Sequence, residues 1–240
     1  AAQAEGAPQI SAAAPGNCCL DWRLGDAVAV TAAFKAAAHL VELRLDNHRI
    51  VTNPMEPRGA VGLFDPASGR YTLHLSSQNV HAIRDLTARA LGVPAAAVRF
   101  VAPDVGGGFG AKNFAYGELA LILWAAKRMG RPVKWIASRS EGFQSDHQAR
   151  DHQAEAALAL DKDGRFLGLR VASFANLGAY LAGSSGGVQT FQYAHLPGTV
   201  YGLPAVDLRV RAVLTNTVPS GVTRGPGFAE MVNIMERLVD

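Results

Sequence analysis

The chain has 240 residues, 49% of them hydrophobic and 18% charged, so it is long enough and apolar enough to bury the core of a globular protein. Its formal net charge is +3 and its basic residues are scattered, which argues against a nucleic-acid partner. No run of roughly 18 apolar residues occurs, so no membrane span is expected. The two cysteines, Cys18 and Cys19, are adjacent, and adjacent cysteines rarely bridge each other, which favours a reducing, cytoplasmic setting.

The amino-terminal residues 1–16 consist mostly of Ala, Gln, Gly and Pro, a composition typical of a linker, and they lack the basic start and apolar core of a secretory signal. A short helix is predicted at residues 27–37, and alternation of apolar and polar residues predicts a half-buried strand at residues 38–46. The chain begins without Met and ends at Asp240 inside a helical pattern that has no stop signal. We therefore expect it to be a piece of something longer.

The segment from Asn53 to Arg58 places a carboxylate between two prolines. Each proline disfavours helical backbone around it, so Glu56 is expected on a stiff extended loop, although a solvated loop charge explains it equally well. A second alternating strand at residues 71–76 leads into a predicted helix at residues 80–91. Gln78 lies at the turn between them, where a side-chain amide can meet a ligand or cap the helix.

Three consecutive glycines, Gly106 to Gly108, follow a predicted strand at residues 98–102 and precede a predicted helix at residues 114–129. Such a run is tolerated where a loop needs unusual dihedral angles or where another group must touch bare backbone. The helix is apolar on most faces, which predicts that it is buried. The free N–H groups of its first turn, together with the glycine amides, predict a site for an anionic or polar ligand.

The rest of the chain predicts more strands and a second glycine-rich turn. Further strands are expected at residues 132–137, 153–160, 165–176 and 206–215. Residues 161–164 supply the turn of a hairpin, and the glycine-rich residues 219–227 carry Arg224 ahead of a final helix. Strands paired in hairpins together with helices favour an α+β fold, a two-layer mixed sheet with helices, over a doubly wound parallel sheet.

The glycine run also matches the dinucleotide-binding fingerprint, as Gly106-x-Gly108-x-x-Ala111. Against this interpretation, Pro103 and Asp104 interrupt the segment that leads from the strand to the glycines. The acidic residue expected about 20 positions further on is also not evident. The phosphate-binding loop pattern fails, because Lys112 is flanked by the wrong residues. The residues alone therefore predict a glycine-loop site for a polar ligand in an α+β domain.

Five segments of the chain together resemble one known family. They are Asn53–Arg58, Ser77–Asn79, Gly106–Lys112, Gly130–Val133 and Thr223–Gly227. Their order and spacing are similar to those of the molybdenum-binding large subunit of the xanthine dehydrogenase, aldehyde oxidase and carbon monoxide dehydrogenase family. The resemblance implies that residues 17–240 are the first half of the cofactor-binding region, either as a fragment or as a split subunit, and that a complementary second half completes it.

The family resemblance also implies a cofactor and partners. The cofactor is a molybdopterin dinucleotide with molybdenum, held between the two halves, and oxygen from water is inserted into a C–H bond of an aldehyde or nitrogen heterocycle. Electrons then pass to iron–sulfur and FAD groups in partner subunits. We therefore expect a small-molecule substrate, an iron–sulfur subunit, an FAD subunit and an oligomeric complex.

Individual residues can be carried over from the same resemblance. Gln78 resembles the glutamine that hydrogen-bonds near the apical ligand of molybdenum, and Arg224 resembles an arginine that contacts the cofactor or the substrate side. The loop whose backbone amides meet the cofactor is matched by Gly107, Gly108, Phe109 and Gly110, with Phe109 packing beside the metal. The implied catalytic residues are Gln78, Phe109 and Arg224, and no protein ligand to the metal is expected.

Four departures from the family pattern bear on the substrate. Asn113 stands where xanthine-oxidising members have a glutamate, which argues against purine oxidation. Gly225 replaces the cysteine that holds copper in carbon monoxide dehydrogenases, which argues against that substrate. Thr223 and Pro226 replace substrate-stacking phenylalanines, which leaves the substrate open.

The family's general-base glutamate lies in the second half, beyond Asp240, so this chain alone is expected to be inactive. Two alternatives from other functional classes remain. A non-catalytic assembly or structural subunit would bind partners but no pterin. A nicotinamide dinucleotide-binding domain would use residues 106–111, and it is the less favoured of the two.

Overall fold

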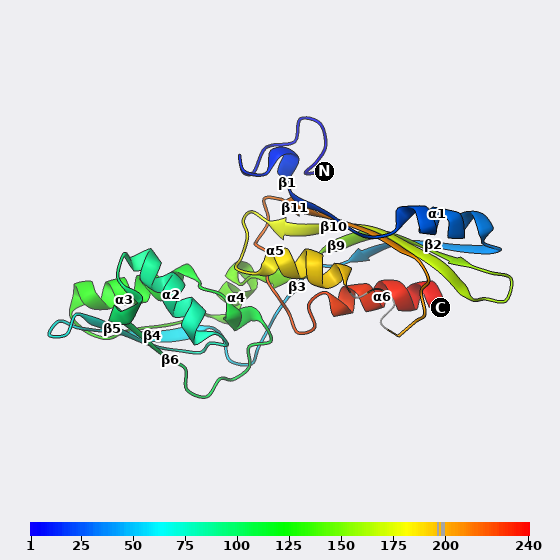
Figure 1. Ribbon diagram of the computed structural model, residues 1–240. Coiled ribbons are helices and arrows are strands. Elements are labelled where there is room, and N and C mark those ends of the chain that lie inside the picture. Colours follow the sequence, from blue (N-terminus) through cyan, green and yellow to red (C-terminus); the bar gives the residue numbers. More distant parts are fainter. Residues whose placement is uncertain (196, 198–199) are drawn as a thin grey trace. The chain divides into compact units, whose positions relative to one another are not determined.

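The computed structural model describes residues 1–195, 197 and 200–240 (Figure 1). The chain forms two compact units. The split unit comprises Ala1–Ile50 and His147–Asp240, and the inserted unit comprises Val51–Asp146. Each unit has its own sheet and its own hydrophobic core.

The split unit is built on a five-stranded mixed sheet. In spatial order its strands are β1 (Cys18–Gly25), β11 (Val206–Leu214), β10 (Phe166–Gly178), β9 (His152–Leu160) and β2 (His39–Asn47). All neighbours are antiparallel except β10 and β11, which are parallel. The predicted β9–β10 hairpin is confirmed, with Leu160 opposite Phe166.

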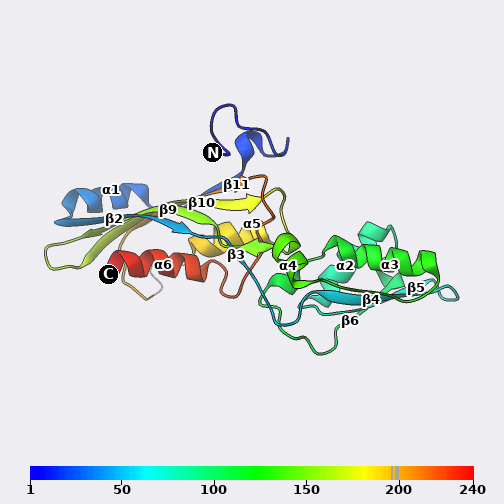
Figure 2. The same ribbon diagram turned by 180° about the vertical axis from the view of Figure 1, so that it is seen from behind.

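Helices cover both faces of this sheet. They are α1 (Ala27–Ala36), the single turn α5 (Ser185–Gly187) with the π-helix η4 (Val188–Gln192), and α6 (Phe228–Val239). Figures 1 and 2 show α1 on one face and α6 on the other. Residues on the α6 side of the strands, such as Leu158, Val171 and Leu208, pack with Met231 and Ile234 of α6, as the alternation of inward and outward residues predicts.

The amino-terminal residues form turns and one 3-10 turn, η1 (Pro15–Asn17). The buried side chain of Asn17 holds them, donating to the carbonyls of Ala2 at 2.8 Å and Pro8 at 2.9 Å and accepting from the amide of Ile10 at 2.7 Å. The assignment of residues 1–16 as a linker stays a prediction.

The inserted unit contains a four-stranded mixed sheet in the order β6 (Val98–Val101), β5 (Arg70–Leu75), β4 (Gly59–Asp65) and β7 (Val133–Ile136). The β5–β6 pair is parallel and the other pairs are antiparallel. Helices α2 (Val80–Leu91) and α3 (Gly117–Met129) cover one face of it (Figures 1 and 2). Its core includes Leu73, Ile83 and Leu123.

Shorter elements complete the two units. They are the 3-10 turns η2 (Ala95–Ala97) and η3 (Ala111–Asn113), the helix α4 (Arg139–Ser145), and the paired two-residue strands β3 (Ile50–Val51) and β8 (Gln148–Ala149). The α+β prediction, with mixed sheets and helices, is confirmed. No helix within the described ranges is long and apolar enough to cross a membrane.

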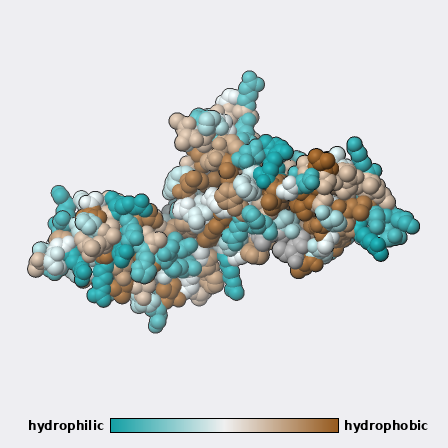
Figure 3. All heavy atoms as spheres, in the orientation of Figure 1, coloured by the Kyte–Doolittle hydropathy of each residue, from teal (hydrophilic) through white to brown (hydrophobic). Residues whose placement is uncertain are grey.

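Helix α3 differs from the prediction in two respects. It begins at Gly117 rather than at Phe114. It is also buried on one face only, since Leu121 is 63% exposed and Trp124 is 54% exposed, while Leu123 is fully buried. Apolar and polar side chains are likewise mixed over the surface seen in Figure 3. An apolar composition therefore did not imply burial on every side.

Candidate functional site

Strand topology brings two predicted site segments together. Because β5 and β6 are parallel neighbours, their carboxyl ends lie at the same edge of the inserted unit's sheet. β5 continues into the turn that holds Gln78, and β6 continues into the glycine loop (Gly106–Lys112). The backbone N–H of Gln78 donates to the carbonyl of Lys112 at 3.0 Å, so the turn and the loop are in contact.

The carboxamide of Gln78 supports the glycine loop through its oxygen. Oε1 accepts from the N–H of Gly110 at 2.9 Å and from the N–H of Lys112 at 3.3 Å. Both partners are donors, so the carboxamide must present its oxygen to them. The other end of the exposed side chain, Nε2, then remains as a donor, and no described residue accepts from it. Gln78 can thus hold the loop and still offer one donor to a ligand.

Close packing explains two of the three consecutive glycines. A Cβ at Gly106 would lie 2.6 Å from the Cβ of Glu56, and a Cβ at Gly108 would lie 2.4 Å from Oε1 of Gln78. Both distances are far below any real contact, so a side chain at either position would force the loop or its supporting residue to move. Gly106 and Gly108 therefore allow the loop to pack closely on Glu56 and Gln78.

Backbone conformation explains the other glycines. Gly107 has a φ of 95° and Gly110 a φ of 106°, a region that side-chain-bearing residues rarely enter. Phe109 between them has a φ of 51°, which is uncommon for an aromatic residue, and the residue is 48% exposed. The loop thus winds tightly and presents the Phe109 ring to solvent.

Three successive N–H groups of the loop have no acceptor in the part of the chain that the structure describes. They belong to Gly107, Gly108 and Phe109. The N–H groups on either side are committed, that of Gly106 to Glu56 at 2.9 Å and that of Gly110 to Gln78. A row of free amides in such a wound loop is a typical binding site for anionic or oxygen-rich groups.

An ion pair holds the ends of the loop. The ammonium group of Lys112, whose side chain is fully buried, lies 2.7 Å from Oε2 of Glu56. The same oxygen accepts from the N–H of Gly106 at 2.9 Å and from the hydroxyl of Ser76 at 2.5 Å. Burial opposes ionisation of Glu56, but the hydrogen bonds from Lys112, Ser76 and Gly106 outweigh it and lower the pKa of this carboxyl. Glu56 is therefore more than the solvated loop charge that sequence alone allowed.

Sequence reasoning did not assign a role to Lys112. The available signal was a lysine inside the largely apolar stretch from Ala111 to Tyr116, because a lysine that becomes buried needs a carboxylate nearby. Residues 113–116 also separate the loop from helix α3, which begins at Gly117. The donors of the site are thus the loop's own amides, and the predicted contribution of the first turn of α3 is not needed.

The remaining predicted residue, Arg224, belongs to the split unit. Its side chain is exposed, and no residue in the described ranges pairs with its guanidinium group. The loop that carries Arg224 is held by Arg150, which donates to the carbonyls of Arg224 at 3.0 Å and Gly225 at 3.2 Å. Arg150 is in turn paired with the buried carboxylate of Glu230 at 3.0 Å. Sequence reasoning missed both residues of this buried pair.

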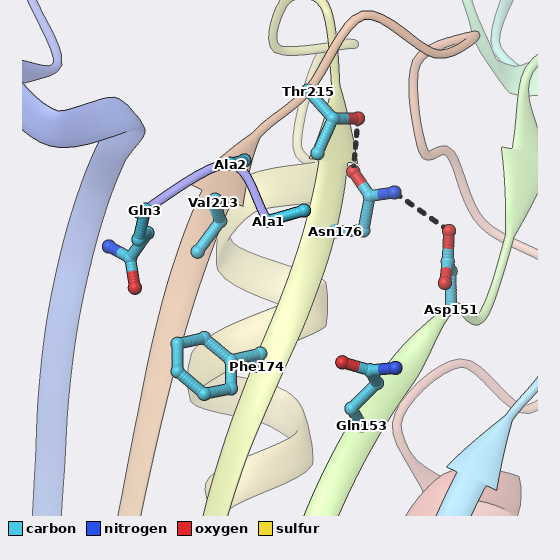
Figure 4. A pocket seen from close by; sticks show the side chains of 9 residues that line it. All are labelled: Ala1, Ala2, Gln3, Asp151, Gln153, Phe174, Asn176, Val213 and Thr215. Atoms are coloured by element: carbon cyan, nitrogen blue, oxygen red, sulfur yellow. Dashed lines mark hydrogen bonds between the residues drawn. The ribbon is translucent and has the colours of Figure 1, made fainter. Parts of the chain in front are cut away.

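A separate cavity of about 300 Å³ lies on the sheet of the split unit (Figure 4). The side chains of Gln153 and Phe174 and the terminal residue Ala1 line it. Three of its polar side chains are paired with one another, since Asn176 donates to Asp151 at 2.8 Å and accepts from Thr215 at 2.7 Å. None of the predicted site residues lines this cavity, so the glycine loop with Gln78 is the better candidate.

Comparison with known proteins assigns the family. The model of the molybdopterin cofactor-binding domain matches residues 10–240. The chain is 35% identical over 221 residues to the carbon monoxide dehydrogenase large chain of Hydrogenophaga pseudoflava, which covers 91% of this chain and 28% of that protein. It is 36% identical over 214 residues to the 6-hydroxypseudooxynicotine dehydrogenase complex subunit gamma of Paenarthrobacter nicotinovorans, covering 87% of this chain and 26% of that protein.

The fold agrees with these matches. The structure of quinoline 2-oxidoreductase from Pseudomonas putida 86 superimposes with a TM-score of 0.89 and 31% identity, covering 100% of this chain and 30% of that chain. The chain thus spans less than a third of the length of these relatives. The match over residues 10–240 and the identities above 30% confirm the resemblance drawn from the five motifs. The chain belongs to the molybdopterin cofactor-binding domains of the carbon monoxide dehydrogenase and xanthine dehydrogenase family.

Proposed function

We propose that this chain binds the molybdopterin dinucleotide cofactor as part of a molybdenum-dependent hydroxylase. The observation that carries the proposal is the row of three free amides from Gly107 to Phe109, placed beside the free Nε2 donor of Gln78. All four groups donate hydrogen bonds, which fits a ligand rich in oxygen and negative charge. When bound, the molybdenum cofactor supplies the redox chemistry of the reaction.

The chain's own residues bind and orient that cofactor. The N–H groups of Gly107, Gly108 and Phe109 would donate to its oxygen atoms, and the carboxamide of Gln78 would add a side-chain donor. The exposed Phe109 ring would pack against one side of it. Such fixed dipoles stabilise charge without reorganising, because the loop geometry is already set by Glu56 and Gln78.

Lys112, the one charged residue within the loop, does not present a free charge to a ligand. The ammonium of Lys112 is neutralised at 2.7 Å by Glu56, and burial removes it from solvent. The exposed guanidinium of Arg224 remains a predicted contact to the cofactor or the substrate side. Gln78, Phe109 and Arg224 are accordingly the residues we propose to act at the reacting groups.

The substrate we propose is an aldehyde or nitrogen heterocycle, with the heterocycle favoured. The chain has Asn113 and Gly225. The family resemblance implies a glutamate and a cysteine at these positions in members acting on xanthine and carbon monoxide. A solved relative at 31% identity is a quinoline oxidoreductase, and quinoline is a nitrogen heterocycle. The complementary half, the iron–sulfur subunit and the FAD subunit are proposed partners in a cytoplasmic complex, and the isolated chain is proposed to be inactive.

The nicotinamide alternative lacks structural support. A dinucleotide fingerprint places the phosphates at the start of a helix that follows the glycines directly. Here residues 111–116 intervene before α3 begins at Gly117, and the amides of Gly106 and Gly110 are occupied by Glu56 and Gln78. The assembly-subunit alternative differs in its expected metal content, which the following experiment measures.

The test is the cofactor content of the full protein purified with its partners, wild type and Gly108→Ala. The new methyl group would displace Gln78, which lies 2.4 Å from that position, and we expect molybdenum and pterin per chain to fall at least about fivefold. The matched control is Gly117→Ala, because nothing lies within 4 Å of a Cβ there. Full cofactor content in folded Gly108→Ala, or none in the wild-type complex, would contradict the proposal.

A further inference from the structure

The two ends of the glycine loop are attached to a single residue from another segment. At the first end, the N–H of Gly106 donates to Oε2 of Glu56 at 2.9 Å, and the N–H of Glu56 donates back to the carbonyl of Gly106 at 3.1 Å. At the last end, the ammonium of Lys112 reaches the same Oε2 at 2.7 Å. The three free amides lie between these attachments.

The ion pair is asymmetric in its burial. The Lys112 side chain has no exposed surface, whereas the Glu56 side chain is 40% exposed. A buried ammonium is strongly destabilised when it lacks a partner, and Glu56 is the one carboxylate that pairs with it among the described residues. The position of Lys112, and with it the end of the loop, therefore depends on the charge of Glu56.

Glu56 itself is held in place. It lies between Pro54 and Pro57, which restrict the backbone, and Arg139 donates to the carbonyl of Met55 at 2.9 Å. The hydroxyl of Ser76, at the end of β5, donates to Oε2 of Glu56 at 2.5 Å. A stiff support of this kind can impose its position on a loop that consists largely of glycine.

We propose that Glu56 and Lys112 are positioning residues that fix both ends of the glycine loop and so keep the amides of Gly107 to Phe109 free for the cofactor. Neither residue needs to touch the cofactor. That the free amides serve the cofactor rests on the proposed function. The effect of Glu56 and Lys112 on the loop does not depend on cofactor binding.

The test is backbone hydrogen exchange of the full protein, wild type and Glu56→Gln. Glutamine keeps an oxygen that can accept from Gly106 and Ser76 but removes the charge that faces Lys112. We expect the amides of Gly110 and Lys112, which are bonded to Gln78 and not to Glu56, to exchange about tenfold faster. No change, or a change confined to Gly106, would overturn the positioning role.

Two further variants separate charge from packing. Asp85→Asn removes a surface ion pair with Arg84 in the same unit and should leave loop exchange unchanged. The double variant Glu56→Gln with Lys112→Met removes both charges and should restore slow exchange at Gly110. A double variant that exchanges as fast as Glu56→Gln would show that the unpaired charge is not the cause.

Molybdenum per chain is measured on the same samples. If the wild type carries the metal and exchange responds as expected, both proposals stand. If exchange responds but the wild-type complex contains no molybdenum, the proposed function fails while the positioning of the loop holds. If molybdenum is present and exchange does not respond, the positioning proposal alone fails.

Discussion

At the scale of single residues, Gln78 supports the glycine loop with one end of its carboxamide and leaves the other end free. Its oxygen accepts from the amides of Gly110 and Lys112, and its Nε2 group stays available for a ligand. The sequence showed Gln78 at a strand-to-helix turn and left open whether it caps the helix or meets a ligand. The structure gives the capping of α2 to Asn79, whose side chain accepts from the amide of Ala82.

We predict that Gln78→Ala slows turnover of the assembled enzyme about tenfold or more, because it removes both the loop support and the ligand donor. The side chain is exposed, so the melting temperature should stay close to that of the wild type. Steady-state kinetics and a thermal melt check the two parts. An unchanged turnover rate would remove Gln78 from the site.

The lowered pKa of Glu56 predicts how the protection of the loop amides depends on pH. A carboxyl whose pKa is lower in the folded protein stabilises it above the unfolded-state pKa, near 4.5, and this contribution is lost as pH falls through the lower folded-state pKa. Protection of the Gly110 amide, corrected for the intrinsic exchange rate, should therefore be constant above about pH 4.5 and fall below it. In Glu56→Gln this acid-dependent step should disappear, and its persistence would assign it to another group.

At the scale of elements, local signals located α1, α2, α3 and α6 and some of the strands, but not α4 or α5. Asn79 and Gly92, which has a φ of 68°, set the bounds of α2 as predicted. β1 and β4 were missed. β1 carries charged residues whose partners lie on the neighbouring strand, as in the ion pair between Asp21 and Arg209 of β11. The sequence of β1 alone does not show these partners.

Strand β4 was missed because glycine interrupts its pattern. A Cβ at Gly62 would lie 2.7 Å from Cγ2 of Ile122 in α3 and 3.2 Å from its carbonyl oxygen. The glycine thus permits a close approach between a strand and a helix that are distant in sequence. The same limit applied to the site, where Glu56 and Lys112 are separated by 56 positions and no local pattern could pair them.

We predict that Gly62→Ala lowers the free energy of unfolding by about 1–3 kcal/mol, because the methyl group must displace α3 from the sheet. Chemical denaturation of the full protein measures this, with Gly117→Ala as a control that meets no neighbouring atom. Equal stability of the two variants would mean that α3 can shift without cost, and the close-packing explanation would be wrong.

At the scale of the whole molecule, both units contain an ion pair with a buried cation beside a glycine-rich loop. The ion pair holds the loop in each unit, Lys112 with Glu56 in the inserted unit and Arg150 with Glu230 in the split unit. The order of five short motifs was enough to identify the family, because together they are specific. The supporting ion pairs escaped notice, because each joins a residue inside a motif or beside it to a distant partner.

We predict that Glu230→Ala is strongly destabilising, by about 3–5 kcal/mol, because it leaves Arg150 buried without its counter-ion. The Glu230 side chain is 1% exposed and that of Arg150 is 10% exposed, so solvent offers little compensation. Denaturant unfolding of the variant checks the loss. A change no larger than that of a surface substitution would show that the pair does not support the second loop.

We propose that this chain forms part of a molybdenum enzyme's cofactor site. The most direct measurement is molybdenum per chain, by elemental analysis of the full protein purified with its native partners. We expect a content close to one atom per chain. A complex that contains the complementary half but carries no molybdenum would contradict it, and would favour an assembly subunit instead.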